Sequence, residues 1–325
     1  MKVIRFGQDR LVREPRASLT LGTFDGVHLG HRDLLTELVR GDLPTVVTFE
    51  PHPQHVLRTH PDRLPLLTST QEKLRKLERA GIQRAVILPF TKELSQLSAD
   101  EFLRRLLLEE IGMARLVVGF NHSFGRNREG NLDFMRASSR ELGFELVVVA
   151  ALREGEDAIS STRIRRALSI GELRDANRYL TSAYRMAARV VRGEGRGHNL
   201  GFPTANLVPV DPDQLIPAEG VYAVRVLIDD EVLDGVASIG RKETFGENPL
   251  AIEVHIFDRS LDLYDQTLEV EWIDYLRPQM AFDNAEALIA EMEKDSSSAR
   301  MVLAQTDPEG LIPERDDNEN ETKQV

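Results

Sequence analysis

Cysteine is absent from the 325-residue chain, and its absence excludes several kinds of chemistry at once. A chain without thiols has no disulfide, no thiolate metal site and no cysteine nucleophile. Histidine, aspartate and glutamate side chains remain available as metal ligands. Catalysis or metal binding in this protein therefore relies on oxygen and nitrogen groups.

Long apolar runs are also missing, since no stretch approaches the ~20 residues that a helix needs to cross a bilayer. The N-terminal segment, Met1 to Arg10, lacks the uninterrupted apolar core of a signal peptide. We therefore expect a cytoplasmic protein with no membrane partner.

Basic residues are in the minority, with 41 Lys and Arg against 53 Asp and Glu and a net charge of −12. Proteins that bind nucleic acids usually carry a basic surface, so this balance argues against a nucleic-acid partner. Part of the negative charge is local, because residues 306–325 hold seven acids and two bases. This segment has no apolar periodicity, and we expect an acidic, disordered tail over 306–325.

The length of the chain and its hydrophobic periodicity predict two domains of different class, α/β followed by β. Up to about residue 181 strands alternate with helices, which predicts a parallel sheet wound by right-handed crossovers. The strands expected there are 18–22, 44–49, 84–90, 115–120 and 144–150, and the helices are 33–40, 70–80, 98–111 and 132–142. We place the domain boundary between residues 181 and 182.

The second domain, 182–305, consists mostly of strands with period-2 alternation. These strands are expected at 184–191, 220–228, 232–239, 251–257 and 268–275, with a helix from 284 to about 304. Successive strands without intervening helices predict an antiparallel barrel, here closed by a C-terminal helix.

The stretch from Gly22 to His31 joins the first expected strand to a helix. Free amide groups and the helix dipole make such a helix start a site for an anion, usually a phosphate. His28 and His31 could donate hydrogen bonds to phosphate oxygens and stabilise charge during transfer. The alternative is a turn with two surface histidines, in which Asp25 caps turn amides rather than orienting the loop or reaching a metal. The stretch fits neither the Walker A pattern nor G-x-G-x-x-G.

Two more polar loops follow strands of the expected sheet, at the edge where ligands bind in such folds. The loop 119–130 carries Arg126 and Arg128, which could bind a phosphate or simply form a solvated basic loop. The segment 159–165 could bind phosphate through hydroxyls and helix amides, or act only as an N-cap before helix-forming residues.

Gly22-Thr-Phe-Asp-Gly-Val-His-Leu-Gly-His31 resembles the signature of the HxGH nucleotidyltransferases. More narrowly, it resembles the FMN adenylyltransferase half of the bacterial bifunctional riboflavin kinase/FAD synthetases. The resemblance implies a Rossmann-like domain in which His28 and His31 hold the phosphates of ATP while AMP is transferred. Ile159-Ser-Ser-Thr-Arg-Ile-Arg165 resembles the second nucleotide motif, which implies that Arg165 stabilises charge on the leaving pyrophosphate. Implied nucleotide contacts are Gly22, Phe24, Asp25, Gly26, Asn121, Ser160, Ser161 and Thr162, and expected flavin contacts are Arg126 and Arg128.

Residues 193–206 form a second glycine-rich stretch, Gly-Glu-Gly-Arg-Gly-His-Asn-Leu-Gly-Phe-Pro-Thr-Ala-Asn. Its amides could wrap phosphates and its Thr204 and Asn206 oxygens could bind Mg²⁺, or it could be a flexible hairpin loop. The stretch resembles the riboflavin kinase signature G-x-G-R-G-x-x-L-G-F-P-T-A-N, which implies an antiparallel barrel of six strands. The resemblance implies that Thr204 and Asn206 bind the Mg·nucleotide, with Gly193, Gly195 and Gly197 as nucleotide contacts.

Glu253 lies in an apolar strand, where alternation alone would point it to water. The resemblance places it at the catalytic base, which takes the proton from the riboflavin 5′-hydroxyl. Arg277 is either a flavin contact or a surface charge near the last helix. Two positions depart from the family pattern, with Ala188 in place of a usual glycine and Glu243 in place of a usual proline.

Taken together, the resemblances imply a bifunctional enzyme of flavin cofactor synthesis. Its C-terminal domain would make FMN and ADP from riboflavin and ATP, and its N-terminal domain would make FAD and pyrophosphate from FMN and ATP. Mg²⁺ or another divalent cation is the expected cofactor. Two other hypotheses remain open: an adenylyltransferase whose barrel only binds flavin, and a non-catalytic flavin sensor. The sequence also leaves the oligomeric state open, a homo-oligomer included.

Overall fold

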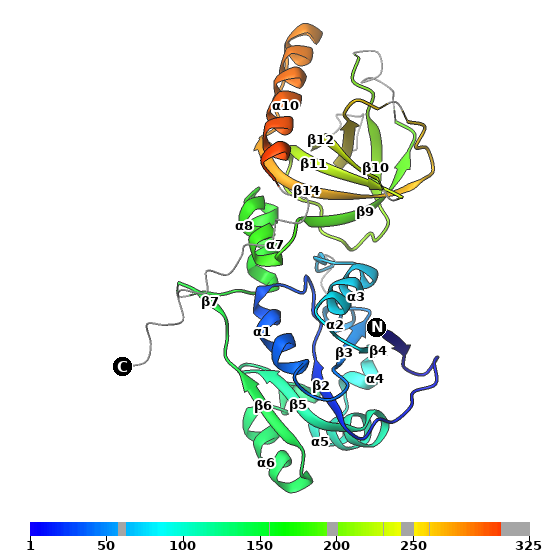
Figure 1. Ribbon diagram of the computed structural model, residues 1–325, viewed down its shortest axis with the longest axis vertical. Coiled ribbons are helices and arrows are strands. Elements are labelled where there is room, and N and C mark those ends of the chain that lie inside the picture. Colours follow the sequence, from blue (N-terminus) through cyan, green and yellow to red (C-terminus); the bar gives the residue numbers. More distant parts are fainter. Residues whose placement is uncertain are drawn as a thin grey trace. The chain divides into compact units, whose positions relative to one another are not determined.

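The computed structural model describes residues 1–57, 63–155, 157–193, 201–229, 231–241, 250–259 and 261–306. The chain divides into two compact units, Met1–Ser161 and Thr162–Val325, each of which has its own sheet (Figure 1). Among the described helices, none combines the length and hydrophobicity that a membrane crossing requires.

The first unit is built on a six-stranded sheet in which every neighbouring pair is parallel. The strand order is β1-β4-β3-β2-β5-β6, so β2 lies in the interior of the sheet and is buried at all five positions. This architecture confirms the parallel sheet expected from the sequence. The strands are β1 (Lys2–Arg5), β2 (Ala17–Leu21), β3 (Thr45–Glu50), β4 (Arg84–Pro89), β5 (Met113–Gly119) and β6 (Glu145–Val149).

Strand β1 lies outside the set of strands that the sequence predicts. It pairs with β4 at the edge of the sheet, and only Ile4 of its four residues is buried. So short a strand with one buried residue carries no alternation signal. A two-stranded hairpin, β7 (Arg153–Glu154) and β8 (Asp157–Ala158), was likewise not expected.

The helices of the first unit begin at residues suited to capping. Ser98 accepts a hydrogen bond from the Glu101 amide at the start of α5, and Ser69 caps α3 in the same way. Leu103 and Leu107 pack with strand residues such as Leu116 in the larger core of this unit. The elements are α1 (Leu29–Leu38), α2 (Pro53–Leu57), α3 (Thr70–Arg79), α4 (Lys92–Ser95), α5 (Ala99–Glu101), η1 (Phe102–Ile111), η2 (Arg126–Arg128) and α6 (Leu132–Leu142).

The second unit contains a closed six-stranded barrel with the order β10-β13-β12-β11-β14-β9. All six pairs are antiparallel, which confirms the barrel expected from the sequence. Strand β10 is not among the strands that the pattern predicts, because it is short and bounded by prolines. The strands are β9 (Tyr184–Val191), β10 (Ala205–Pro209), β11 (Gly220–Ile228), β12 (Glu231–Arg241), β13 (Leu250–Ile256) and β14 (Thr267–Arg277).

Three helices lie in the described part of the second unit, and two of them are joined to β14 by side-chain hydrogen bonds. The expected C-terminal helix is α10 (Ala285–Gln305), whose Ala299 and Leu303 are buried against the barrel. Helix α8 (Leu173–Leu180) contributes Asn177, whose amide donates to the carbonyls of Trp272 and Ile273 at 2.8 and 3.2 Å. Helix α7 (Ser161–Ser169) precedes α8.

The division between compact units therefore falls at Ser161/Thr162, twenty residues before the domain boundary expected from the sequence. The segment between the two positions is helical and its second helix packs on the barrel strands β9 and β14.

Candidate functional sites in the two units

The Gly22–His31 loop runs between β2 and α1 in an unusual backbone conformation. Phe24 and Val27 have φ values of +49° and +45°, in a region that non-glycine residues rarely occupy. Gly26 between them has φ of +87°. A loop with two such residues persists only where surrounding contacts hold it.

The carboxylate of Asp25 supplies one set of those contacts. It is 3 % exposed and accepts hydrogen bonds from the amides of Leu67 (2.9 and 3.1 Å) and Thr68 (3.1 Å). The Thr68 hydroxyl in turn accepts from the Gly26 amide at 3.1 Å. These bonds tie the loop to the segment before α3 and are not caps on the amides of the turn itself.

Lys73 of α3 supplies a second set of contacts to the loop. Its Nζ donates to the carbonyl oxygen of Thr23 at 3.3 Å and to the hydroxyl of Thr48 at 3.2 Å. Sequence reasoning missed this residue. The signal was available, because Lys73 precedes the core residue Leu77 by four positions and so lies on the same buried face of α3.

His28 and His31 are packed together, which contradicts the alternative of two surface histidines. His28 is 5 % exposed and is the N-cap of α1, and the two rings stack with centroids 3.8 Å apart. The amide of His28 donates to Nδ1 of His31 at 3.3 Å. This bond leaves the proton of a neutral His31 on Nε2, where it can serve as a donor.

Desolvation lowers the pKa of His31 to about 4, although the Asp25 carboxylate acts in the opposite direction. The ring is therefore neutral at pH 7 in the protein alone. A neutral imidazole beside amide groups at a helix start provides directional hydrogen-bond donors without a fixed charge.

The segment ahead of α7 lies against this loop. A Cβ at Gly30 would stand 2.6 Å from the carbonyl oxygen of Ile159, so only glycine allows the two backbones to approach this closely. Ser161 Oγ donates to the carbonyl of Asp25 at 2.9 Å. The first unit thus brings Ser160 and Ser161 to the Gly22–His31 loop, while Thr162 and Arg165 belong to α7 in the second unit.

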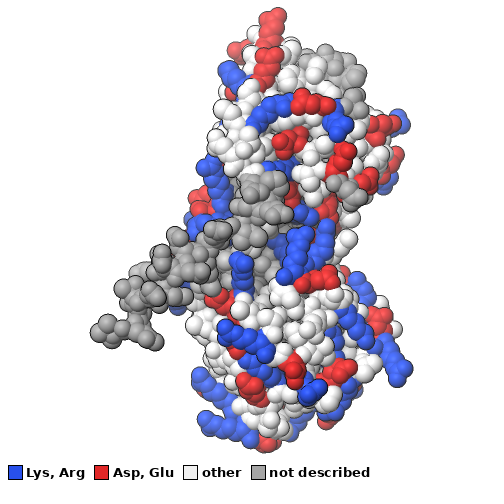
Figure 2. All heavy atoms as spheres, in the orientation of Figure 1, with Lys and Arg blue, Asp and Glu red and all other residues white. Residues whose placement is uncertain are grey.

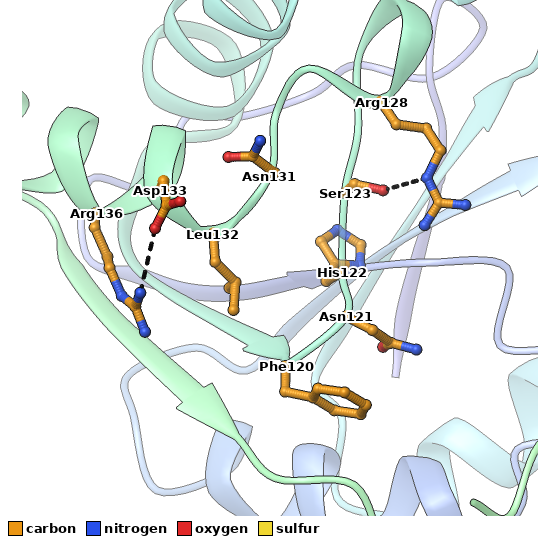
Figure 3. Close-up of a pocket in the computed structure, with 9 residues that line it drawn as sticks. All are labelled: Phe120, Asn121, His122, Ser123, Arg128, Asn131, Leu132, Asp133 and Arg136. Carbon is orange, nitrogen blue, oxygen red and sulfur yellow. Dashed lines mark hydrogen bonds and ion pairs between the residues drawn. The ribbon is translucent and has the colours of Figure 1, made fainter.

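A cavity of about 450 Å³ opens beside the loop that follows β5 (Figure 3). Arg128 Nε donates to Ser123 Oγ at 2.8 Å, which fixes one predicted flavin contact at the cavity wall. Burial and the nearby Arg128 lower the pKa of His122 to about 4. The residues that line the cavity are Phe120, Asn121, His122, Ser123, Arg128, Asn131, Leu132, Asp133 and Arg136.

Of the predicted residues in this loop, Asn121 and Arg128 line the cavity and Arg126 does not. Asp133 and Arg136, which pair at 3.4 Å on α6, were not predicted. Their signal was weak, because an exposed acid and base three residues apart are typical of any helix surface.

In the barrel, the strand register brings the predicted kinase residues together. Asn206 on β10 lies opposite Glu253 on β13, and Glu253 lies opposite Ser238 on β12. Thr204 Oγ1 is 3.5 Å from a carboxylate oxygen of Glu253. The start of the loop lies against Asn206, since a Cβ at Gly193 would stand 2.1 Å from Asn206 Nδ2 and the side chain would have to turn aside.

A hydroxyl, an amide oxygen and a carboxylate oxygen in one place are hard donors that suit Mg²⁺, which takes few protein ligands and fills its remaining positions with water and substrate phosphates. The described residues contain no group of three or more His, Asp or Glu side chains arranged to hold a metal. Thr204 and Asn206 are the residues here that could hold such a cation. Gly195, Gly197 and Glu243 lie outside the described residues.

His255 holds the turn that carries Thr204, and sequence reasoning did not predict this role. Its Nδ1 lies 2.8 Å from the carbonyl oxygen of Pro203, and its ring packs edge-on against Phe202. Since His255 follows Glu253 by two positions on β13, the two side chains lie on the same face of the strand.

Arg277 has a structural partner in the described structure. Its Nε and Nη2 donate to the two carboxylate oxygens of Asp295 at 2.8 and 2.7 Å, and its Nη1 donates to the Pro278 carbonyl at 2.9 Å. The pair joins the end of β14 to α10. The hydrogen bond to Asp295 also raises the pKa of the guanidinium.

Comparison with known proteins assigns each unit to a catalytic family. A family model described as FAD synthetase matches residues 12–163, and one described as riboflavin kinase matches residues 180–303. The protein named bifunctional riboflavin kinase/FMN adenylyltransferase from Listeria monocytogenes is 37 % identical over 292 residues, covering 88 % of this chain and 92 % of its own. The Escherichia coli K12 protein of that name is 36 % identical over 317 residues, covering 95 % of this chain and all of its own.

A crystal structure of a protein named macrolide-efflux protein from Streptococcus pneumoniae has the same fold, with a TM-score of 0.83 at 31 % identity. It covers 92 % of this chain and 99 % of its own. Two family models in the order expected from the motifs, together with relatives aligned over nearly their whole length, leave one assignment: the chain belongs to the family of bifunctional riboflavin kinase/FMN adenylyltransferases.

Proposed function

We propose that the two activities of this family are carried by the residue sets described above, one in each unit. In the barrel, riboflavin is phosphorylated by ATP to give FMN and ADP. In the first unit, FMN reacts with a second ATP to give FAD and pyrophosphate. The observation that carries the kinase assignment is the meeting of Thr204, Asn206 and Glu253 across the register of β10 and β13.

In the kinase step, the 5′-hydroxyl of riboflavin attacks the γ-phosphorus of ATP and Glu253 accepts the proton of that hydroxyl. Positioning and stabilisation of charge supply most of the rate in such transfers. Glu253 is suited to this role because it extends from a rigid strand and is flanked by Thr204. Gly193, Gly195 and Gly197 would contact the nucleotide.

In the adenylyl-transfer step, a phosphate oxygen of FMN attacks the α-phosphorus of ATP and pyrophosphate leaves. No side-chain nucleophile is required. His28 and His31 would hold the phosphates, and the Phe24–Gly26 turn would offer backbone amides. Gly22, Asp25, Asn121, Ser160, Ser161 and Thr162 would complete the nucleotide contacts, with Arg165 at the leaving pyrophosphate and Arg128 and Arg126 toward the flavin. In the barrel, Arg277 would contact the flavin.

We further propose that a divalent cation such as Mg²⁺ is held by Thr204 and Asn206. When bound, it would neutralise charge on the phosphates of ATP. The Arg277 contact with flavin is the least supported of these roles, because its guanidinium already binds Asp295.

The functional domains are proposed as 1–181 and 182–305, with an acidic tail at 306–325. Acidic and basic side chains are interspersed over both units on the face shown in Figure 2, which supports small-molecule partners over nucleic acid. We also propose that the protein is cytoplasmic, where ATP is available, and that it can form a homo-oligomer.

The first test is a product assay with purified protein, ATP and Mg²⁺, supplied with either riboflavin or FMN. FAD from riboflavin is the expected result. Glu253→Gln should lower the rate of riboflavin phosphorylation by about a hundredfold or more, since general-base catalysis contributes that much. Adenylylation of supplied FMN should be unchanged in this variant, because Glu253 belongs to the other unit.

Each contrary outcome of this assay points to a specific alternative. FAD from FMN but no product from riboflavin in the wild type would indicate an adenylyltransferase whose barrel only binds flavin. Binding of flavin without any product would indicate a flavin sensor.

A further inference from the structure

Lys73 is a buried lysine that has no part in the adenylyl-transfer step proposed above. The side chain is 8 % exposed, and in the described part of the chain its Nζ bonds only to two neutral oxygens, Thr23 O and Thr48 Oγ1. Burial lowers its pKa, and the charges of Asp25 and Glu50 raise it without an ion pair to either. A buried ammonium is more costly than an apolar side chain of the same length, so packing alone does not account for a lysine here.

The bonds of Lys73 determine which way one peptide group of the Gly22–His31 loop faces. The carbonyl oxygen of Thr23 accepts from Lys73 Nζ at 3.3 Å and also from Thr48 Oγ1 at 3.2 Å. In a planar trans peptide the N–H points opposite to the C=O. Because the Thr23 carbonyl is turned toward β3 and α3, the amide of Phe24 is turned away from them.

The Phe24 amide thus lies on the side of its peptide opposite to Lys73. No acceptor for it is found among the described residues, although the amides of Gly26 and Val27 in the same loop both have one. The residue is 2 % exposed and has φ of +49°, a conformation that only surrounding contacts maintain. An amide without an acceptor next to the start of α1 is a typical donor to a phosphate oxygen.

We propose that Lys73 is a positioning residue for adenylyl transfer: with Thr48, it holds the Thr23 carbonyl inward so that the Phe24 amide binds a phosphate oxygen of ATP. The inference rests on the proposed role of the Gly22–His31 loop as the ATP site. It assigns to Lys73 no contact with substrate.

The test compares Lys73→Met, which keeps the length and removes the donors and the charge, with Lys73→Arg, which keeps both. Lys92→Met is the matched control, because Lys92 is an exposed lysine of the same unit and its loss changes the net charge equally. FMN adenylylation is measured at varied ATP, and binding of pyrophosphate and of adenosine is measured by competition. Riboflavin phosphorylation by the same preparations reports on the integrity of the second unit.

Lys73→Met should lower kcat/KM for ATP by about tenfold or more, the usual effect of losing a hydrogen bond at a charged ligand. Pyrophosphate should bind more weakly by a similar factor and adenosine equally well, a difference that a general loss of structure would not produce. Lys73→Arg should recover part of the loss, and Lys92→Met should match the wild type.

A direct readout comes from protein labelled with ¹⁵N-phenylalanine, in which the Phe24 peak is assigned by its absence in Phe24→Leu. Addition of pyrophosphate should shift this peak in the wild type and not in Lys73→Met. Thr48→Val removes the second donor to the Thr23 carbonyl and keeps Lys73. This variant should lose less pyrophosphate affinity than Lys73→Met, and its Phe24 shift serves as the test if Lys73→Met does not fold.

Unchanged pyrophosphate affinity and an unchanged Phe24 shift in Lys73→Met would overturn the inference while leaving the proposed function intact. If the wild type itself makes no FAD from FMN, the proposed function fails and the variants need not be compared. Equal weakening of pyrophosphate and adenosine would show that Lys73 only maintains the fold, which also overturns the inference.

Discussion

Two histidines of the first unit are held in the neutral state by their surroundings. Desolvation lowers the pKa of both His31 and His122 to about 4, from an ordinary value near 6.5. Each ring is therefore a hydrogen-bonding group at neutral pH rather than a cation. For His31 this state suits an N–H donor to phosphate whose strength does not depend on small changes of pH near neutrality.

The lowered pKa values predict how the stability of the first unit depends on pH. Because the folded pKa lies below the unfolded one, the unfolded chain binds more protons between pH 6.5 and 4. The stability is thus fully present above pH 6.5 and falls as the pH drops toward 4, by about 1.4 kcal/mol per pH unit for each additional proton. Urea unfolding followed by far-UV circular dichroism at several pH values measures this slope.

His31→Gln and His122→Gln should each reduce that slope by the contribution of one bound proton, about 1.4 kcal/mol per pH unit. The exposed-charge variant Lys92→Met should leave the slope as it is in the wild type. A slope identical in all four proteins would show that neither histidine is held neutral in the folded state.

At the level of elements, contacts between sequence-distant segments position the candidate sites. Helix α10 is held to the end of β14 by Arg277 and Asp295, and this pair is largely buried, with side chains 16 % and 9 % exposed. Removing Asp295 would leave Arg277, in a poorly solvated place, with the longer contact to Glu291 at 3.7 Å in place of two short bonds. The residue that the sequence offered as a flavin contact therefore anchors a helix in this structure.

Asp295→Ala should destabilise the barrel by about 2 to 4 kcal/mol, because Arg277 loses both of its bonds to the carboxylate. Trp272, the only tryptophan of the chain, is fully buried in the barrel, so its fluorescence reports the unfolding of this unit. Glu293→Ala, at an exposed position of the same helix, is the control and should have little effect. If Asp295→Ala unfolds at the same denaturant concentration as the wild type, Arg277 is not an anchor and its flavin role regains support.

The sequence predicts most of the elements because their buried faces repeat with regular periods. Five parallel strands and the larger barrel strands follow from apolar runs and alternation, and the glycine-rich loops follow from their motifs. The edge strand β1 was missed because it buries only Ile4, and β10 was missed because prolines interrupt its surroundings. Lys73 and His255 were missed for a different reason: each bonds to a backbone carbonyl, of Thr23 and of Pro203, and a sequence does not show which carbonyl a side chain will reach. The helical spacing of Lys73 from Leu77 indicates its burial but not its partner.

On the scale of the whole molecule, the chain contains two compact units, each with a core of its own. The predicted residues of each activity, with the exception of Thr162 and Arg165, belong by their sequence position to the unit to which the activity is assigned. Separate cores and separate residue sets imply that one site can be inactivated without loss of the other.

A mixture of His31→Gln and Glu253→Gln proteins should therefore convert riboflavin to FAD, although neither variant does so alone. The first variant supplies FMN from its intact barrel, and the second adenylylates it after diffusion. Chromatography of the products over time should show FMN before FAD. If each variant retains its one activity and the mixture still makes no FAD, FMN must pass between sites within a single chain.

The close backbone approach at Gly30 also bears on how such a protein can change during evolution. A single methyl group there would collide with the carbonyl oxygen of Ile159, a backbone atom that cannot turn aside as a side chain can. Glycine and alanine codons differ by one nucleotide. The Gly22–His31 loop is thus one base change from being distorted without altering a charge, a motif histidine or the barrel, which gives lineages a short route from a bifunctional ancestor to a descendant that keeps only the barrel's activity.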